Sequence, residues 1–559
     1  MEVEAVESNT LPSAADRRTS KRDRRVFWAC MFILANNCFQ CTAYFAVSTN
    51  LVNYLKDRLH VGSKAAANGV TNWMGTASMT PLVAAFLADA FLGRYWTIAL
   101  FLLISVAAYV VLTASAAVAA VESAGAFYAG LYLLALGGAL QPVLISFGAN
   151  QFDESDEAGR ARQSSFFNWF YLSINVGSLI GGTVLVWVQS SVSWGLGYGI
   201  PALLSLVAVA VFLAGTAAYQ RHQPPGGSPI TRVTQVVVAA VTKWRVVAPE
   251  DAAELHECEA DDGMSAIQGS RRLAHTDQFR FLDKAAVETP VDKSRPSPWR
   301  LCTVTQVEEL KCVLRLLPVW ASGIIFAAAY TQMTTTFILQ GDTLDPYVGG
   351  FRVPAAVLSV FDTLSVMLWV PLYDRVIVPL ARRATGHDRG FTQLARMGVG
   401  LVVLAAGMLA AGTLEVERRR VIARHGMYDT NTGAGGGDGK YLPLSIFWQV
   451  PQYAVVGASE VFTFIGQMEF FYDQAPDAMR SLCSGLSMTS FALGNYVSSA
   501  LVTVVARATA RGGSDGWIPD DINRAHLDNF FWLLAMLCMG NFGVYLLIAR
   551  WYNYKKTAD

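Results

Sequence analysis

Charged residues are scarce in this chain of 559 residues, where Asp, Glu, Lys and Arg together make up 15%. A soluble domain typically carries about 25%. The shortage argues against a soluble protein, and the 53% hydrophobic content favours a membrane protein. Acidic and basic residues balance at 43 each, so the net charge gives no sign of a nucleic-acid partner, and we expect none.

Clustered cysteines are also missing. The eight cysteines are scattered and form neither a disulfide nor a zinc framework: Cys30, Cys38, Cys41, Cys258, Cys302, Cys312, Cys483 and Cys538. The CxxC spacing of Cys38 and Cys41 favours small buried residues over a redox pair. The glycine-rich run at 433–440 departs from a phosphate-binding loop and reads as a flexible loop. We therefore expect no enzyme, no metal and no cofactor, with protons as the coupling ion to consider.

Long apolar runs take the place of these features. A bilayer is crossed by about 20 helical residues, and twelve segments are long enough: 27–55, 66–90, 96–120, 126–148, 164–189, 196–219, 309–338, 354–379, 391–414, 443–471, 481–507 and 527–551. The middle of the first segment, Asn36–Thr42, is polar but uncharged. Such groups face a bundle interior or a wet cavity, because an unsatisfied polar group in hydrocarbon costs several kcal/mol. The pattern predicts an all-α membrane protein with a central polar path.

The spacing of these segments divides the chain into two six-helix halves, 27–219 and 309–551. Between them, 220–308 is predicted to be a cytosolic linker with a short amphipathic helix near 231–247, and 1–26 and 552–559 are predicted cytosolic tails. Two such halves are typical of the major facilitator fold, with the solute site at the midplane. Four arginines disagree with this orientation, since they fall in a loop predicted outside: Arg418, Arg419, Arg420 and Arg424.

Five sequence strings point to a family: Asp89–Tyr95, Phe147–Asp153, Phe166–Tyr171, Pro298–Lys311 and Gly457–Phe462. Together they resemble the plant nitrate and peptide transporter family, part of the proton-dependent oligopeptide transporters, over about residues 25 to 555. The resemblance implies a bilayer-embedded symporter of small solutes: nitrate, di- or tripeptides, or small organic anions. It leaves the plasma membrane and the vacuolar membrane as alternatives.

The chain departs from this family at its ionisable positions. The family's first-span Glu-x-x-Glu-Arg/Lys motif falls on 37–41, where this sequence has Asn37, Gln40 and Cys41. Gln141 replaces a fourth-span Lys, and Ser78 replaces a second-span Tyr. Removing one member of a buried ion pair costs about 3–5 kcal/mol, whereas replacing every member with neutral groups avoids that cost. We therefore expect retained transport with altered or lost proton coupling; the alternative is a receptor or sensor that transports weakly or not at all.

Other residues are candidates for the solute and proton path. Glu460 lies within an apolar span, where burial disfavours its charge and lets it carry a proton near neutral pH. Asp362 serves either transport or a helix cap. Five side chains either line the cavity or pack between helices: Tyr44, Tyr171, Tyr330, Gln332 and Trp448. Asp89 with Arg94 is predicted to form a gating latch on the cytosolic side.

Overall fold

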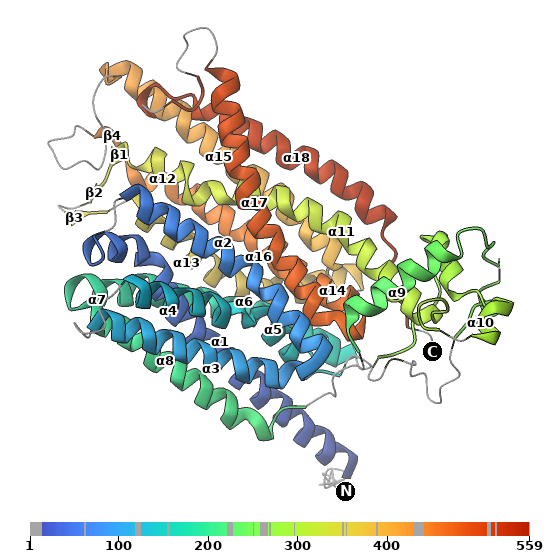
Figure 1. Ribbon diagram of the computed structural model, residues 1–559. Coiled ribbons are helices and arrows are strands. Elements are labelled where there is room, and N and C mark those ends of the chain that lie inside the picture. The colour runs from blue at the N-terminus through green and yellow to red at the C-terminus, as the bar shows by residue number, and fades with distance from the viewer. Residues whose placement is uncertain are drawn as a thin grey trace, which may run out of the picture.

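The computed structural model describes residues 14–60, 63–117, 124–153, 157–220, 227–249, 251–257, 267, 270–295, 297–348, 351–353, 355–386, 390–428, 441–510, 516–519 and 522–557. Cys258 and the glycine-rich run at 433–440 lie outside these ranges. Helices run side by side through one bundle, with short strands at one end and α9, α10 and the C-terminus at the other (Figure 1). The latter end is called the linker end below.

The helices of the first half are α1 Ala14–Asp57, α2 Ser63–Leu87, α3 Gly93–Ala117, α4 Ala124–Gly137, α5 Gln141–Ala149, α6 Glu157–Ile180, α7 Val186–Ser191 and α8 Trp194–Ala214. Those of the second half are α11 Val304–Tyr330, α12 Thr336–Gly341, α13 Ser359–Leu372, α14 Val378–Thr385, α15 Gln393–His425, α16 Val450–Gln474, α17 Arg480–Thr509 and α18 Leu527–Trp551. Between the halves lie α9 Pro229–Thr242 and α10 Pro290–Ser294. The amphipathic helix expected near 231–247 corresponds to α9.

Short 3₁₀ and π segments link or interrupt these helices: η1 Ala88–Leu92, η2 Gly138–Leu140, η3 Gly181–Leu185, η4 Gly215–Ala217, η5 Ala252–Glu254, η7 Arg280–Ala286, η8 Thr331–Thr334, η9 Ala355–Leu358, η10 Tyr373–Ile377, η11 Ile446–Gln449, η12 Asp477–Met479 and η14 Ile522–Arg524. The strands are β1 Leu344–Asp345, β2 Tyr347–Val348, β3 Phe351–Arg352 and β4 Leu442–Ser445. β1 pairs with β4 in parallel, and β2 pairs with β3 antiparallel.

Within the described residues, ten helical stretches are long and apolar enough to cross a membrane. One of them, Trp73–Ala117, holds the end of α2 and all of α3, and Gly93 turns the chain between these helices with a φ of 73°. α16 is not among the ten, and it carries several polar residues, including Gln452, Glu460 and Gln467. If Trp73–Ala117 is counted as two spans and α16 is added, the ten stretches become twelve spans, consistent with the prediction.

The basic cluster after residue 414 is helical, so the prediction that it lies in a loop is wrong. α15 continues to His425, and Arg418 is fully buried within the bundle. Its guanidinium forms an ion pair with Glu415 at 2.7 Å, which offsets the cost of burying both charges. Arg419 likewise pairs with Asp528 at 3.2 Å. The paired charges let this helix extend beyond its apolar stretch.

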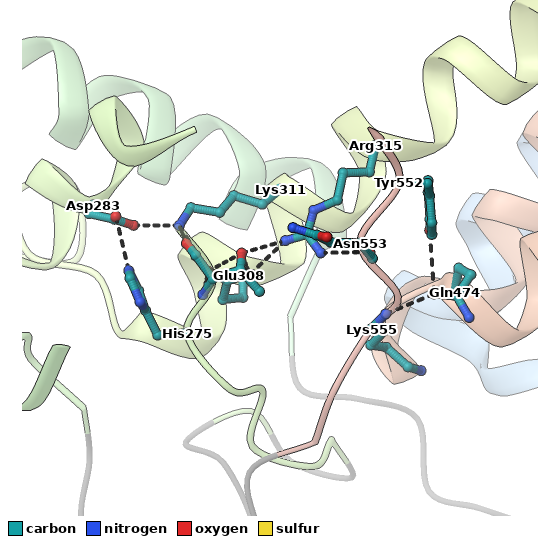
Figure 2. Close-up of polar contacts among 10 residues, drawn as sticks. His275, Asp283, Glu308, Lys311, Arg315, Gln474, Tyr552, Asn553 and Lys555 are labelled. Carbon is teal, nitrogen blue, oxygen red and sulfur yellow. Dashed lines mark hydrogen bonds and ion pairs between the residues drawn. The ribbon is translucent and has the colours of Figure 1, made fainter. Parts of the chain in front are cut away.

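The segment between the halves docks on the linker end of α11 through a chain of ion pairs (Figure 2). Lys311 lies 2.6 Å from Asp283 and 2.9 Å from Glu308, and Arg315 lies 2.8 Å from Glu308. His275, Asp283 and Glu308 bring three potential metal-ligand atoms within 4.8 Å of one another. Because two cations already pair with these carboxylates, the cluster reads as a neutralised structural network rather than a metal site.

Candidate functional site: a neutral cavity beside a buried acid

A cavity of about 220 Å³ lies mainly among helices of the first half. About 10–15 Å³ of such space holds one water molecule, so the cavity has room for several waters or a small solute. Its lining is Asn37, Gln40, Cys41, Tyr44, Phe45, Ala77, Pro81, Tyr109, Ala135, Gly138, Leu140, Gln141, Ile174 and Met488. Met488 belongs to α17 of the second half, so both halves border the space.

Five residues singled out in the sequence meet in this cavity: Asn37, Gln40, Cys41, Tyr44 and Gln141. The Gln141 amide donates to the Cys41 sulfur at 3.4 Å, which joins α5 to α1. None of the described residues that line the cavity is Asp, Glu, Lys or Arg. The hydrogen bonds around the cavity are therefore made by amide, hydroxyl and thiol groups.

The first-helix amides have neutral partners on neighbouring helices. The Asn37 amide donates to the Ser173 hydroxyl of α6 at 2.8 Å. The Gln40 amide donates to the Ser205 hydroxyl of α8 at 3.1 Å. Amides can donate and accept at once, so these side chains fill polar positions without a buried charge.

The position of these amides is fixed by a close contact between α1 and the helix formed by α6 and η3. A Cβ atom on Gly177 would lie 2.7 Å from the Cβ of Cys41, and one on Gly181 would lie 2.4 Å from the Thr42 carbonyl oxygen. Glycines four residues apart let two membrane helices approach closely. The spacing of Gly177 and Gly181 thus holds the polar middle of α1 against α6.

Glu460 is buried in α16 and is not among the residues lining this cavity. Tyr171 of α6 donates its hydroxyl hydrogen to Oε1 of Glu460. The bond joins the first half to the second, one helical turn along α6 from the cavity residue Ile174. The tyrosine therefore connects the acid with the cavity wall.

Two further predicted residues are partners in helix packing. The Gln332 amide donates to Ser498 of α17 at 2.7 Å and is fully buried. Tyr330 packs its ring against Phe464 with centroids 5.2 Å apart, and its side chain also contacts Glu460. Neither is among the residues lining the cavity.

Ser78 and Trp448 also lie away from this cavity lining. The Ser78 hydroxyl donates to the Met74 carbonyl within α2 at 2.8 Å. Trp448 lies in η11, where 62% of its surface is exposed. The cavity thus gathers one part of the predicted set, and the residues outside its lining are Ser78, Trp448, Tyr330, Gln332, Tyr171 and Glu460.

Asp89 and Arg94 link the halves at the linker end. Their side chains lie 3.5 Å apart, and Asp89 is buried. The Asp89 carboxylate accepts from the Leu482 backbone N–H at 2.9 Å, while Arg94 donates to the Ser481 hydroxyl at 2.9 Å and to the Asp477 carbonyl at 3.4 Å. One ion pair in the first half therefore contacts the start of α17.

Further polar contacts between the halves lie at the same end. Asn168 donates to Asp374 at 3.0 Å and accepts from Arg396 at 2.7 Å, and Arg480 donates to Asn150 at 2.9 Å. Sequence reasoning assigned none of these residues a contact between the halves, although Asn150 and Asn168 lie in two of the strings that carry the family resemblance.

Comparison with known proteins then identifies the family, because residues 95–518 match the sequence profile of the POT family. The chain belongs to the POT family. Among the relatives of this POT family member, Protein NRT1/ PTR FAMILY 8.1 of Arabidopsis thaliana is 54% identical over 548 residues, covering 95% of this chain and 94% of that protein. Protein NRT1/ PTR FAMILY 8.3 of Arabidopsis thaliana is 50% identical over 550 residues, covering 95% and 92%.

Solved structures share the fold of this POT family member. The crystal structure of an auto inhibited POT family peptide transporter superposes with a TM-score of 0.60 at 22% identity, covering 94% of this chain and 97% of that one. A POT family transporter in complex with 5-aminolevulinic acid gives a TM-score of 0.57 at 12% identity, covering 93% and 96%. The predicted all-α membrane fold and the resemblance to plant nitrate and peptide transporters are confirmed, and the protein is a transporter, not an enzyme.

Proposed function

We propose that this POT family member carries a small polar solute across the bilayer by alternating access, with proton coupling altered from the family pattern. The observation that carries the proposal is the cavity lined by amides, thiol and tyrosines, beside a buried acid that bonds across the two halves. Nitrate, di- or tripeptides and small organic anions remain the candidate solutes. Without a lysine or arginine in the lining, the cavity favours those that are neutral or zwitterionic.

The coupling is altered because the first helix holds no titratable carboxylate in the cavity. Asn37 and Gln40 make hydrogen bonds to serine hydroxyls that do not change between pH 5 and 8. Proton dependence, where present, then has to come from the second half. We place both termini in the cytosol because of the basic residues that flank the spans, and the plasma and vacuolar membranes stay as alternatives for the location.

The test is uptake by the purified full-length protein in liposomes, using nitrate, dipeptides and organic anions with and without an inward pH gradient. Solute-dependent flux supports a carrier, and saturable binding without flux would favour the receptor or sensor. The variant Gln141→Leu removes one cavity amide worth about 1 kcal/mol, so we expect KM to rise about fivefold. The matched control Ser78→Ala lies outside the lining and should leave uptake unchanged.

A further inference from the structure

Two acids from neighbouring helices of the second half are buried at one point. Asp362 lies in the first turn of α13 and Glu460 lies in the middle of α16, and each is 4% exposed. Their carboxyl groups are within hydrogen-bonding contact of each other. Gly457 makes room for this approach, since a Cβ atom there would lie 3.0 Å from Oδ1 of Asp362.

The two carboxyl groups leave one oxygen each without a donor. In the part of the chain that the structure describes, no hydrogen-bond donor reaches Oδ1 of Asp362 or Oε2 of Glu460. A carboxylate oxygen only accepts, so two ionised groups cannot satisfy each other. A single proton turns one of them into a donor to the other. It also removes the repulsion between two like charges in a site of low dielectric.

The described groups around the two acids offer no competing positive charge. Tyr171 of α6 and Tyr330 of α11 contact Glu460, and Tyr453 of α16 lies near Asp362. α15 brings Arg396 close to α16, but its guanidinium lies 3.5 Å from Glu469 and donates to a backbone carbonyl of α16. Among the described contacts of the two acids, all other titratable neighbours are neutral phenols.

We propose that Asp362 and Glu460 form a carboxyl dyad that binds one proton between Oδ1 of Asp362 and Oε2 of Glu460. The proton enters from water and makes one O–H bond, so the dyad carries a single negative charge when occupied. Its release leaves two adjacent carboxylates, which must separate or become hydrated. Because Tyr171 bonds Glu460 to the first half, a separation of the two carboxylates changes the contact between the halves.

The proton site is tested by infrared spectroscopy on the detergent-purified full-length protein. At neutral pH we expect a carbonyl stretch from one protonated carboxyl that shifts in heavy water. Asp362→Asn and Glu460→Gln should each abolish it, because the new amide donates to the remaining carboxylate and keeps it ionised. Glu417→Gln, at a half-exposed acid of α15, should leave it intact. Absence of the signal in the unmodified protein, or its survival in both dyad variants, would overturn the proposal.

The consequence for coupling rests on the proposed carrier function, so it is measured separately. In liposomes, an inward pH gradient should stimulate uptake by the unmodified protein, and both dyad variants should lose this stimulation while retaining solute counterflow. A carboxyl signal without counterflow would reject the carrier and keep the dyad. Counterflow without the signal would reject the dyad and keep the carrier.

Discussion

At the residue scale, burial decides what an ion pair contributes. Arg418 and Glu415 lie one turn apart on α15, and both side chains are fully buried. Arg420 and Glu417 have the same separation but lie on the exposed side of this helix. Arg418→Ala leaves the Glu415 carboxylate buried without its cation, and we expect a loss of about 3–5 kcal/mol in unfolding free energy. Arg420→Ala should change it by less than about 0.5 kcal/mol. Thermal unfolding of the purified protein measures both, and equal melting temperatures for the two variants would contradict this reasoning.

Asp292 in α10 makes the linker segment sensitive to acid. Burial alone raises the pKa of Asp292, but hydrogen bonds from Thr289 and the cations of Lys243, at 2.9 Å, and Arg300, at 3.2 Å, outweigh it and hold the pKa well below the ordinary value. A lowered folded-state pKa stabilises the folded form above the ordinary aspartate pKa of about 3.9. That stabilisation is lost as the pH falls below this value.

Hydrogen exchange over residues 284–303, corrected for intrinsic rates, measures this effect. We expect constant protection from neutral pH to about pH 5 and a decline below about pH 4. Asp292→Asn should lower the protection at neutral pH and remove the decline. Glu288→Gln, which alters a half-exposed acid 4.0 Å from Lys293, is the control and should keep the profile. A profile in Asp292→Asn that still falls below pH 4 would assign the sensitivity to another group.

Single residues also show where sequence reasoning reaches its limit. Gln40, Gln141 and Glu460 were predicted to share one hollow; Gln40 and Gln141 line the cavity, whereas Glu460 is not among its lining residues. Asp362 could not be paired with Glu460, since its partner lies 98 positions away on another helix and periodicity does not give helix contacts. Trp448 was predicted within a span, but it precedes α16 and is exposed.

At the element scale, the contact of α1 with the α6–η3 helix depends on glycines. Gly177→Ala would place a Cβ atom 2.8 Å from the Cys38 carbonyl oxygen and 2.7 Å from the Cys41 Cβ, so α6 must shift away from α1. Overpacking of this kind costs about 1–3 kcal/mol. We expect a lower melting temperature and weaker solute uptake, because the same shift moves the cavity amides.

Gly182, which lies in η3 on the same helix, provides a matched control. A Cβ atom on Gly182 would meet only the Thr49 hydroxyl at an ordinary 3.6 Å. Gly182→Ala should therefore leave both the melting temperature and uptake near those of the unmodified protein. Similar losses in the two variants would show that helix propensity, and not the close approach of α1, explains the effect.

Whole elements were predicted more reliably than their ends. Spans such as 527–551 follow directly from long apolar runs and match α18. α15 extends eleven residues past its predicted end at 414, to His425, because buried ion pairs compensate charges that hydropathy counts against a helix. α16 was predicted from 443, but the first residues of that segment form β4 and η11.

At the scale of the whole molecule, the polar bonds described here between the halves gather at the linker end, with Tyr171 and Glu460 near the middle. A carrier that alternates access must break such bonds when this end opens. The arrangement therefore corresponds to a state closed at the linker end. Sequence patterns could not show this, because a conformational state depends on contacts between segments hundreds of residues apart.

The Asp89–Arg94 pair provides the test of that closure. Arg94→Ala removes the bonds to Ser481 and Asp477. It also leaves the Asp89 carboxylate without its cation, and this carboxylate is buried only in the state in which the linker end is closed. The closed state alone is penalised, so the equilibrium shifts toward opening. A hydrogen bond from a charged group contributes about 1.5–3 kcal/mol. A shift of 1.4 kcal/mol is tenfold in population, so we expect the open fraction to rise at least about tenfold.

Distances between spin labels on the linker ends of α5 and α14 report this fraction in the full-length protein. The control is Arg162→Ala, which breaks a half-exposed pair with Asp23 within the first half at 2.8 Å and should leave the distance distribution unchanged. An unaltered distribution in Arg94→Ala would mean that the latch does not hold the halves together. A longer population in both variants would trace opening to lost surface charge and not to the bonds that Arg94 makes with Ser481 and Asp477.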